Sequence, residues 1–303
     1  MENLSSLAQK SIEQVCQQVL GKPQQVKLAL ACLLARGHLL IEDLPGMGKT
    51  TLSHGLAEVL GLTYQRVQFT SDLLPADITG STIFNTDKQS FVFHEGPVFT
   101  QVLLADEINR ASPKTQSALL EAMEERQVTM DGQTHHLPEP FFVIATQNPL
   151  HQSGTHPLPE SQLDRFFMRV SLGYPSKDAE KKLILGDHGR KTTLTQLMDL
   201  GTLSELQSAI EEMEIKEQVV QYILDLVSFT RESGLFKDPL SPRASIALGT
   251  ASKAWAMIHG RDYVTHDDVQ AVFPAVAGHR LNLDAMEQFR IIEDIYAQVP
   301  VKM

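Results

Sequence analysis

The stretch "HLLIEDLPGMGKTT", residues 38–51, decides the fold of this 303-residue chain. A short apolar run leads straight into a glycine-containing loop, and helix-forming residues follow the loop. The phosphate-loop pattern is Gly, four residues, then Gly-Lys-Ser/Thr. Gly48, Lys49 and Thr50 supply the end of this pattern, whereas Asp43 stands where the first Gly belongs. The stretch therefore predicts a nucleotide site and leaves Asp43 to be explained.

A strand, a tight turn and a helix in this order gather backbone N–H groups at the helix N-terminus, where the helix dipole favours an anion. Gly46 and Gly48 permit backbone angles that other residues avoid, and they let the chain approach phosphate closely. Lys49 is suited to reach β- and γ-phosphate oxygens, and Thr50 is suited to offer its hydroxyl to Mg²⁺. The predicted phosphate-binding residues are Pro45, Gly46, Met47, Gly48, Lys49, Thr50 and Thr51.

Two later apolar runs also end in polar residues. "QVLLADE" places Asp106 and Glu107 at a strand end. Asp106 is predicted to hold Mg²⁺ through its water shell, and Glu107 to polarise a water for attack on the γ-phosphate. The alternative is that both are solvated acids. "FFVIATQNP" ends at Asn148, which either contacts the γ-phosphate or the attacking water, or simply forms a turn before Pro149.

Strands that alternate with helices predict right-handed βαβ units and a parallel sheet covered on both faces. Ligands bind such sheets at the carboxyl ends of the strands, which is where these polar residues fall. Residues 80–97 and 126–138 instead look like hairpins, the second with a strong turn signal at Asp131-Gly132. Each hairpin is alternatively an ordinary surface excursion.

From about residue 175 the strand signal nearly disappears, and apolar residues recur at helical spacing. We therefore predict an α/β domain over residues 1–175 and a helical domain over residues 176–303. The helices of the second domain are expected at residues 177–188, 203–212, 216–233, 243–259, 266–278 and 284–297.

The composition, 42% hydrophobic and 21% charged, indicates an ordinary globular protein. A net charge of −11 makes general binding to nucleic acid or anionic membranes a poor hypothesis, although it leaves room for a local basic patch. Cys16 and Cys32 lie in apolar helical segments and are expected to be buried thiols in a reducing compartment. The N-terminus has no apolar signal core, and the run "LALACLLA" is far shorter than the ~20 residues of a membrane span. We expect a cytoplasmic protein.

The eleven histidines raise the question of a metal site. His135 and His136 are adjacent, so they cannot both face one metal from a helix or strand. His151 and His156 flank a glycine-containing loop. We expect none of these four residues to bind a metal.

Six stretches of the sequence resemble motifs of one protein family. Together they are far more specific than any one of them alone. They are "EDLPGMGKTT", "RVQFTSDLLPADITG", "LLADEINRASPKTQSALLEAMEERQVT", "ATQNP", "LPESQLDRFFM" and "SPRAS". In that order they resemble the phosphate loop, the segment after the second strand, the Walker B strand with its helix, sensor 1, the arginine-finger segment and sensor 2 of the MoxR family of AAA+ ATPases. The resemblance covers roughly residues 15–280. In that family Asp commonly replaces the first Gly of the loop.

The resemblance implies an α/β fold with an AAA+ P-loop NTPase core, in which a parallel five-stranded sheet lies between helices, followed by a smaller all-α lid domain. It identifies the hairpins at residues 80–97 and 126–138 as the helix 2 insert and the pre-sensor 1 hairpin. In related rings these hairpins point toward the pore or one face. Their movement against a bound client would convert hydrolysis into mechanical work.

Residue by residue, the resemblance assigns Asn148 as sensor 1 and Arg165 as the arginine finger, which stabilises charge on the γ-phosphate held by a neighbouring subunit. The alternative for Arg165 is an ion pair with Asp164 or Glu160. Arg243 is implied to be sensor 2, which reaches back to the phosphates so that the lid reports the nucleotide state.

Val19, Leu20 and Gly21 resemble the segment that cups the adenine, and their alternative role is core packing. Two segments depart from the family pattern, "HQSGTHPLPE", with His151 and His156, and "AVAGHRLNL". We expect neither departure to affect hydrolysis.

The resemblance implies an ATP hydrolase that uses ATP and Mg²⁺ in a ring oligomer, often a hexamer. Members are thought to remodel or mature protein complexes, often with a partner that bears a von Willebrand A domain. We expect no nucleic-acid partner and no membrane insertion. The alternatives are a nucleic-acid motor or regulator, which the acidic charge opposes, and a nucleotide-gated scaffold, which the set Lys49, Asp106 and Glu107 opposes.

Overall fold

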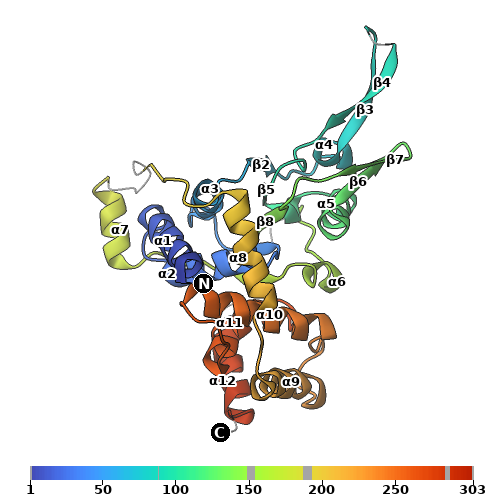
Figure 1. Ribbon diagram of the computed structural model, residues 1–303. Coiled ribbons are helices and arrows are strands. Elements are labelled where there is room, and N and C mark those ends of the chain that lie inside the picture. Colours follow the sequence, from blue (N-terminus) through green and yellow to red (C-terminus); the bar gives the residue numbers. More distant parts are fainter. Residues whose placement is uncertain (1, 88, 149–153, 187–192, 284–286, 302–303) are drawn as a thin grey trace.

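A five-stranded parallel sheet forms the centre of the first part of the chain, in the order β2-β5-β8-β1-β9 (Figure 1). The computed structural model describes every residue except 1, 88, 149–153, 187–192, 284–286 and 302–303. The strands are β1 (Leu39–Glu42), β2 (Tyr64–Gln68), β5 (Val102–Asp106), β8 (Phe142–Gln147) and β9 (Met168–Val170). The predicted α/β core is therefore confirmed.

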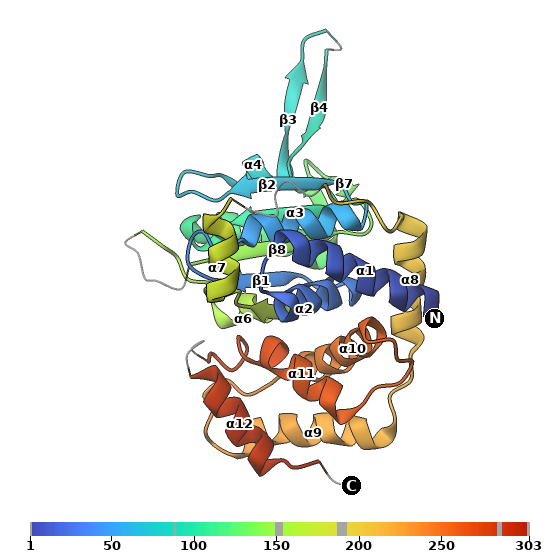
Figure 2. The same cartoon turned by 90° about the vertical axis from the view of Figure 1, so that its left-hand side faces the viewer.

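Alternate side chains of β1 enter two different hydrophobic clusters, because successive residues of a strand face opposite sides of the sheet. Leu39 and Ile41 pack on the side of α1 (Glu2–Gln18), α2 (Pro23–Leu34) and α3 (Lys49–Val59), which lie side by side over that face (Figure 2). Leu40 packs with α5 (Pro113–Glu125) on the other face. Two short helices connect these elements. In sequence, α4 (Pro75–Thr79) lies between β2 and the first hairpin, and η1 (Ile108–Arg110) lies between β5 and α5.

Both predicted hairpins are present. β3 (Gly80–Asn85) pairs with β4 (Ser90–Glu95), and this hairpin projects from the body of the molecule (Figures 1 and 2). β6 (Gln127–Met130) pairs with β7 (Gln133–His136) through a turn in which Asp131 and Gly132 both have positive φ, as the sequence predicts. The rings of Phe93 and His135 stack at 4.0 Å and join the two hairpins.

After β9 the described chain contains only helices. They are α7 (Lys177–Ile184), α8 (Leu200–Glu212), α9 (Glu217–Glu232), α10 (Pro242–Ile258), α11 (His266–Ala277) and α12 (Gln288–Gln298), and α6 (Glu160–Leu163) precedes β9. Their places agree with the predicted helical segments, and the start of the last predicted segment lies outside the described residues. Packing continues across residue 175, since the N–H of Leu197 donates to the carbonyl of Val59 (2.9 Å) and α10 contacts α2. None of the helices described here has the length and apolarity to cross a membrane.

His38 connects three elements at the beginning of β1. Its Nδ1 accepts the N–H of Val143 (3.0 Å), so Nε2 carries the proton and donates to the carbonyl of Met123 (3.2 Å). Burial lowers the pKa of His38 from 6.5 to about 4. The folded protein therefore holds this imidazole neutral over a pH range in which the unfolded chain binds a proton.

We expect the free energy of unfolding to fall as the pH is lowered from 6.5 to 4, because only the unfolded chain takes up the His38 proton in that window. The loss from this residue is about 3 kcal/mol at most. Urea unfolding at several pH values measures it. His38→Gln keeps a donor and an acceptor, and it is expected to flatten the pH dependence. Identical slopes for the two proteins would contradict this role of His38.

Candidate functional site

The phosphate loop lies between the end of β1 and the start of α3. Gly46 (φ 84°) and Gly48 (φ 93°) are both in the left-handed region, as expected from the sequence. A Cβ on either glycine would meet no atom within 4 Å. Backbone strain, rather than crowding, is therefore the reason for glycine at these two positions, and the space above the loop is open to a phosphate group.

Asp43 is buried, and its carboxylate bonds to the chain just after β9. It accepts the N–H of Gly173 (3.1 Å), the hydroxyl of Ser171 (3.1 Å) and the N–H of Leu172. The carbonyl of Asp43 accepts Nζ of Lys49 (2.7 Å). These hydrogen bonds explain why Asp43 stands at the position of the usual glycine, because glycine has no side chain that could accept them.

Lys49 donates to the loop itself, to the carbonyls of Asp43 and Leu44 (2.7 and 3.2 Å). Burial lowers the pKa of Lys49, and the carboxylates of Asp106, Asp43 and Glu107 oppose that shift. The ammonium group is therefore already at the loop and beside the acids of the site. Binding a phosphate there replaces carbonyl acceptors with anionic oxygens, which are stronger acceptors.

Asp106, at the end of β5, is held by two neighbouring strands. Its Oδ1 accepts the hydroxyl of Thr146 in β8 (2.6 Å), and its Oδ2 accepts Nη2 of Arg66 in β2 (2.6 Å). The carboxylate oxygens and the Thr50 hydroxyl are the hard oxygen donors that Mg²⁺ prefers. In the described part of the chain no group of three or more His, Cys, Asp or Glu could hold a metal ion. Mg²⁺ is commonly bound by one or two carboxylates together with substrate phosphates, and Asp106 and Thr50 are the residues that would hold it here.

Glu107 has a left-handed backbone (φ 55°), which is uncommon outside glycine and is typical of functional sites. Its N–H donates to the Thr146 hydroxyl (2.9 Å), so Thr146 fixes both acids of the strand end. Its carboxylate accepts Nε2 of Gln68 and Nη1 of Arg110, each at 2.9 Å. The carboxylate is thereby positioned by two donors beside the phosphate loop.

The sheet register brings the predicted residues together. Glu42, next to Asp43, pairs with Gln147, next to Asn148, and Ala105, next to Asp106, pairs with Ala145 in the same strand. The phosphate loop, the acids and Asn148 therefore lie along one edge of the sheet. The carbonyl of Asn148 accepts the amide of Asn109 (3.3 Å).

The roles of Arg66, Gln68 and Thr146, which donate hydrogen bonds to the two acids or accept one from them, were not predicted from the sequence. The available signals were a hydroxyl residue inside the apolar run "FFVIATQN", and two polar residues two positions apart near the end of "YQRVQ". Side chains two apart in a strand share a face. Their target could not be read without the strand order.

Arg165 and Arg243 lie at the opposite edge of the sheet. Arg165 pairs with Glu124 (2.8 Å), and not with Asp164 or Glu160 as the sequence alternative proposed; Arg243 approaches the same Glu124 (3.4 Å). Both arginines line a hollow of about 300 Å³ that also includes His38, directly before β1. The phosphate loop follows β1, and the four residues of that strand span about 13 Å.

In this arrangement Arg243 does not lie beside the phosphate loop of its own chain, and its predicted contact with the phosphates stays a prediction. Arg243 is the second residue of α10, and α10 packs on α2, so this end of the lid faces the amino ends of the strands. The motif predicted that an arginine begins this helix, but not where the helix lies.

The proposed adenine segment lies near the exit of β9. Val19 is buried, and a Cβ on Gly21 (φ 74°) would come within 3.1 Å of Ala179 in α7. Lys22 donates to the carbonyl of Tyr174. Burial lowers the pKa of Lys22, and Asp43 opposes the shift, so this segment lies close to the phosphate loop. Its position is compatible with contact to the base, and Val19 also belongs to the core.

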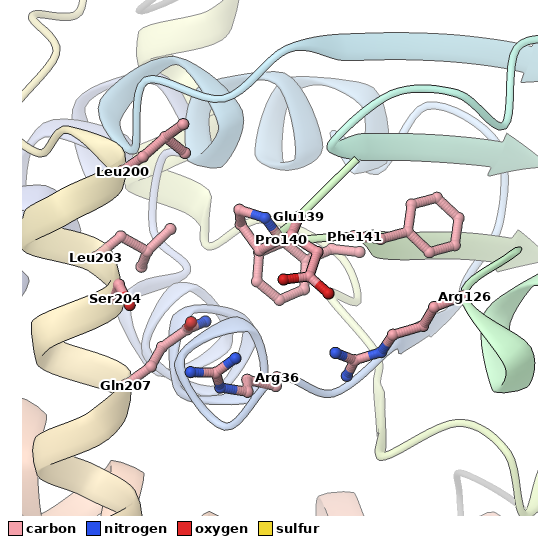
Figure 3. A pocket seen from close by; sticks show the side chains of 10 residues that line it. Arg36, Arg126, Glu139, Pro140, Phe141, Leu200, Leu203, Ser204 and Gln207 are labelled. Atoms are coloured by element: carbon pink, nitrogen blue, oxygen red, sulfur yellow. The ribbon is translucent and has the colours of Figure 1, made fainter. Parts of the chain in front are cut away.

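A second hollow, of about 220 Å³, adjoins the arginine edge (Figure 3). Arg36 and Arg126 extend toward it from different elements, with Glu139 between them (Figure 3). The same two arginines line the hollow that contains Arg165 and Arg243. Five arginines line the two hollows at this edge, against three acids, Glu124, Glu139 and Asp164, on a chain of net charge −11. This edge suits contact with anionic groups from outside the subunit.

Two family profiles match the chain. The family described as "ATPase family associated with various cellular activities (AAA)" matches residues 38–168, and the AAA lid domain matches residues 229–298. "Chaperone MoxR1" of Mycobacterium tuberculosis is 39% identical over 284 residues, which cover 91% of this chain and 75% of that protein. The chain belongs to the MoxR family of AAA ATPases.

The similarity to relatives of this MoxR protein extends over nearly the whole chain. "Uncharacterized protein YeaC" of Bacillus subtilis (strain 168) is 44% identical over 294 residues, 96% of this chain and 92% of that protein. A crystal structure from Cytophaga hutchinsonii, described as a candidate ATPase, superposes with a TM-score of 0.89 at 35% identity, covering 99% of this chain and 96% of that one. Family membership implies ATP binding and hydrolysis.

Proposed function

We propose that this MoxR protein hydrolyses ATP in a ring and uses the energy to remodel or mature protein complexes. The observation that carries the proposal is a set of predicted nucleotide-site side chains along one edge of the sheet, together with a projecting hairpin that exposes apolar side chains. Chaperone activity appears in the name of a 39% identical relative, which supports the same class of function. A hexameric ring and a partner with a von Willebrand A domain are parts of the proposal that rest on the family resemblance alone.

In the proposed reaction the chain's own residues bind, orient and polarise. Lys49 exchanges its bonds to loop carbonyls for β- and γ-phosphate oxygens. Glu107, held by Gln68 and Arg110, accepts a hydrogen bond from the attacking water and increases its nucleophilicity. The amide of Asn148 orients the water or the γ-phosphate. These groups act at the same edge of the sheet.

Thr50 and Asp106 would hold Mg²⁺, which neutralises charge on the phosphates when bound. Arg66 donates to Oδ2 of Asp106, and its side chain is 47% exposed. Thr146 holds the same carboxylate through its 2.6 Å bond to Oδ1. The two donors orient Asp106, whose remaining lone pairs would accept hydrogen bonds from the water shell of Mg²⁺.

Arg165 and Arg243 are proposed to act together on the nucleotide of a neighbouring subunit. Both pair with Glu124 at the edge opposite their own phosphate loop, and their side chains are 33% and 57% exposed. A neighbour's γ-phosphate would compete with Glu124 for the two guanidinium groups. This assignment replaces the expected action of Arg243 within its own subunit.

The two strands of the β3–β4 hairpin carry apolar side chains on both faces just below its polar tip. Phe84 pairs with Phe91 across the strands, and Ile83 pairs with Val92, which faces the other side. Phe84, Phe91 and Ile83 are 50%, 73% and 51% exposed. Projecting apolar side chains of this kind mark a contact site for another protein. We propose that the hairpin contacts the client.

Replacing residues 82–93 with a short Gly-Ser linker is expected to leave ATPase activity within about twofold and to abolish remodelling, because the hairpin lies outside the nucleotide site. Protection of a thermally unfolded reporter protein, measured with ATP, supplies the remodelling readout. The double variant Phe84→Ser, Phe91→Ser keeps the backbone and is expected to behave like the linker. Thr82→Ser is the matched control. Full protection by the double variant would show that the hairpin is a passive excursion.

A further inference from the structure

Asp43 connects two segments that are far apart in sequence. Its carboxylate accepts hydrogen bonds from residues 171–173, directly after β9. Its backbone carbonyl accepts a hydrogen bond from the ammonium group of Lys49. Asp43 is only 6% exposed, so water does not readily replace these partners. A shift of the segment after β9 must therefore move Asp43, and through it the phosphate loop, or break three hydrogen bonds.

β9 joins this contact to the arginine edge. Ser171 follows Arg165 by six residues, and the three residues of β9 lie between them. Arg280 of the lid contacts the beginning of this segment. Its guanidinium donates to Asp164 Oδ1 (2.7 Å) and to the carbonyl of Phe166 (3.0 Å). The Arg280 side chain is 5% exposed. The finger and the lid are thus fixed to one end of β9.

Arg169 ties the middle of β9 to the same two parts. Its Nη1 donates to Glu42 (2.9 Å), the residue before Asp43, and its Nη2 donates to Gln288 of the lid (2.7 Å). The strand is held by charged, partly buried contacts along its length. Such contacts favour movement of the strand as a unit, because slippage would leave desolvated charges without partners.

We propose that Asp43 is a positioning residue that couples the arginine finger of a subunit to the phosphate loop of the same subunit. The inference rests on the proposed action of Arg165 on a neighbour's nucleotide. Engagement of Arg165 moves β9, the segment after β9 moves Asp43, and Asp43 adjusts Lys49. The nucleotide in one site thereby sets the activity of the next site around the ring.

A purely stabilising role for Asp43 predicts something different. In that case its loss lowers the melting temperature, but each nucleotide site still works independently of its neighbours. Communication between sites is therefore the quantity to measure. Replacement with glycine restores the usual phosphate-loop pattern, so it removes the contact without removing a residue that the pattern requires.

The experiment mixes wild-type subunits with Lys49→Ala subunits and follows ATPase activity. Lys49→Ala subunits still carry Arg165, so independent sites lose activity in proportion to the fraction replaced. If a working site also requires nucleotide in the site its own finger faces, replacing half of the subunits at random leaves about one quarter of the activity. We expect about one quarter in the wild type. We expect about one half of the activity to remain when both kinds of subunit in the mixture also carry Asp43→Gly.

Two milder variants keep the test valid if Asp43→Gly folds poorly. Ser171→Ala removes one of the three bonds, and Asp43→Asn keeps the volume but loses one acceptor oxygen. We expect the loss of activity on mixing to become progressively less steep from Ser171→Ala to Asp43→Asn. Asp268→Asn weakens a buried lid ion pair with Arg261 and is the matched control: it is expected to lower stability but to leave about one quarter of the activity on mixing, as in the wild type.

Proportional loss in the wild type, or an equally steep loss in the Asp43 variants, overturns the inference. Those outcomes leave the proposed function intact as long as Arg165→Ala is inactive. Normal turnover by Arg165→Ala instead contradicts the proposed function itself. The two failures are therefore distinguishable.

Discussion

Replacing Glu107 with glutamine is expected to lower ATP turnover by roughly 10²- to 10⁴-fold and to leave ATP affinity nearly unchanged. Glutamine keeps the size of the side chain and can still accept from Gln68 or Arg110, which donate to Glu107 at 2.9 Å. It removes the negative charge that polarises the water. Binding of a fluorescent ATP analogue and steady-state phosphate release measure the two effects separately.

Lys49→Ala is the informative contrast, because it removes a charge that the phosphates need already in the ground state. It is expected to weaken ATP binding itself. Glu121→Gln, an exposed position of α5, controls for loss of one negative charge. Wild-type turnover by Glu107→Gln would remove Glu107 from the mechanism.

The sequence was sufficient for those parts of the site whose chemistry is local. Gly46 and Gly48 predict a turn with left-handed backbone angles, and Asp131-Gly132 predicts a hairpin. Asp106 ends an apolar strand. In each case a few neighbouring residues determine the backbone. The strand order of this superfamily then places the phosphate loop and the acid at one edge, which the observed register confirms.

The missed features depend on contacts between distant segments. Thr146 forms hydrogen bonds with residues 106 and 107 only because β8 lies beside β5. Arg66 reaches Asp106 only because β2 lies on the other side of β5. The position of Arg243 could not be predicted for the same reason, since it depends on the packing of α10 on α2. Periodicity identified that helix but contains no information about its partner.

The second large effect is expected from Arg165→Ala, which should bind ATP normally and hydrolyse it roughly 10³-fold or more slowly. Arg165 lies at the edge of the sheet opposite its own phosphate loop, beside Arg243 and a basic hollow. A guanidinium from this edge stabilises charge on a nucleotide only if the nucleotide belongs to another subunit. Specific activity of the wild type should therefore rise with protein concentration.

The ion pair with Glu124 provides a control that separates the finger from a structural role. Glu124→Ala breaks the 2.8 Å pair and leaves Arg165 in place. If Arg165 only stabilises this edge, Glu124→Ala and Arg165→Ala should cause similar losses. If Arg165 is a finger, Glu124→Ala should retain activity within about tenfold, since the neighbour's phosphate replaces Glu124 as its partner. Arg290→Ala, on the exposed face of α12, controls for charge.

Mixing two inactive variants tests whether the site is shared between subunits. Lys49→Ala has no working loop but carries its finger, and Arg165→Ala has the loop without the finger. Where a loop from the second variant meets a finger from the first, all the groups are present, so mixed rings should regain part of the activity when subunits exchange. Pure rings of either variant contain no such junction and should stay inactive. Turnover that is independent of protein concentration, together with no recovery on mixing, would show that Arg165 acts within its own subunit or has no part in hydrolysis.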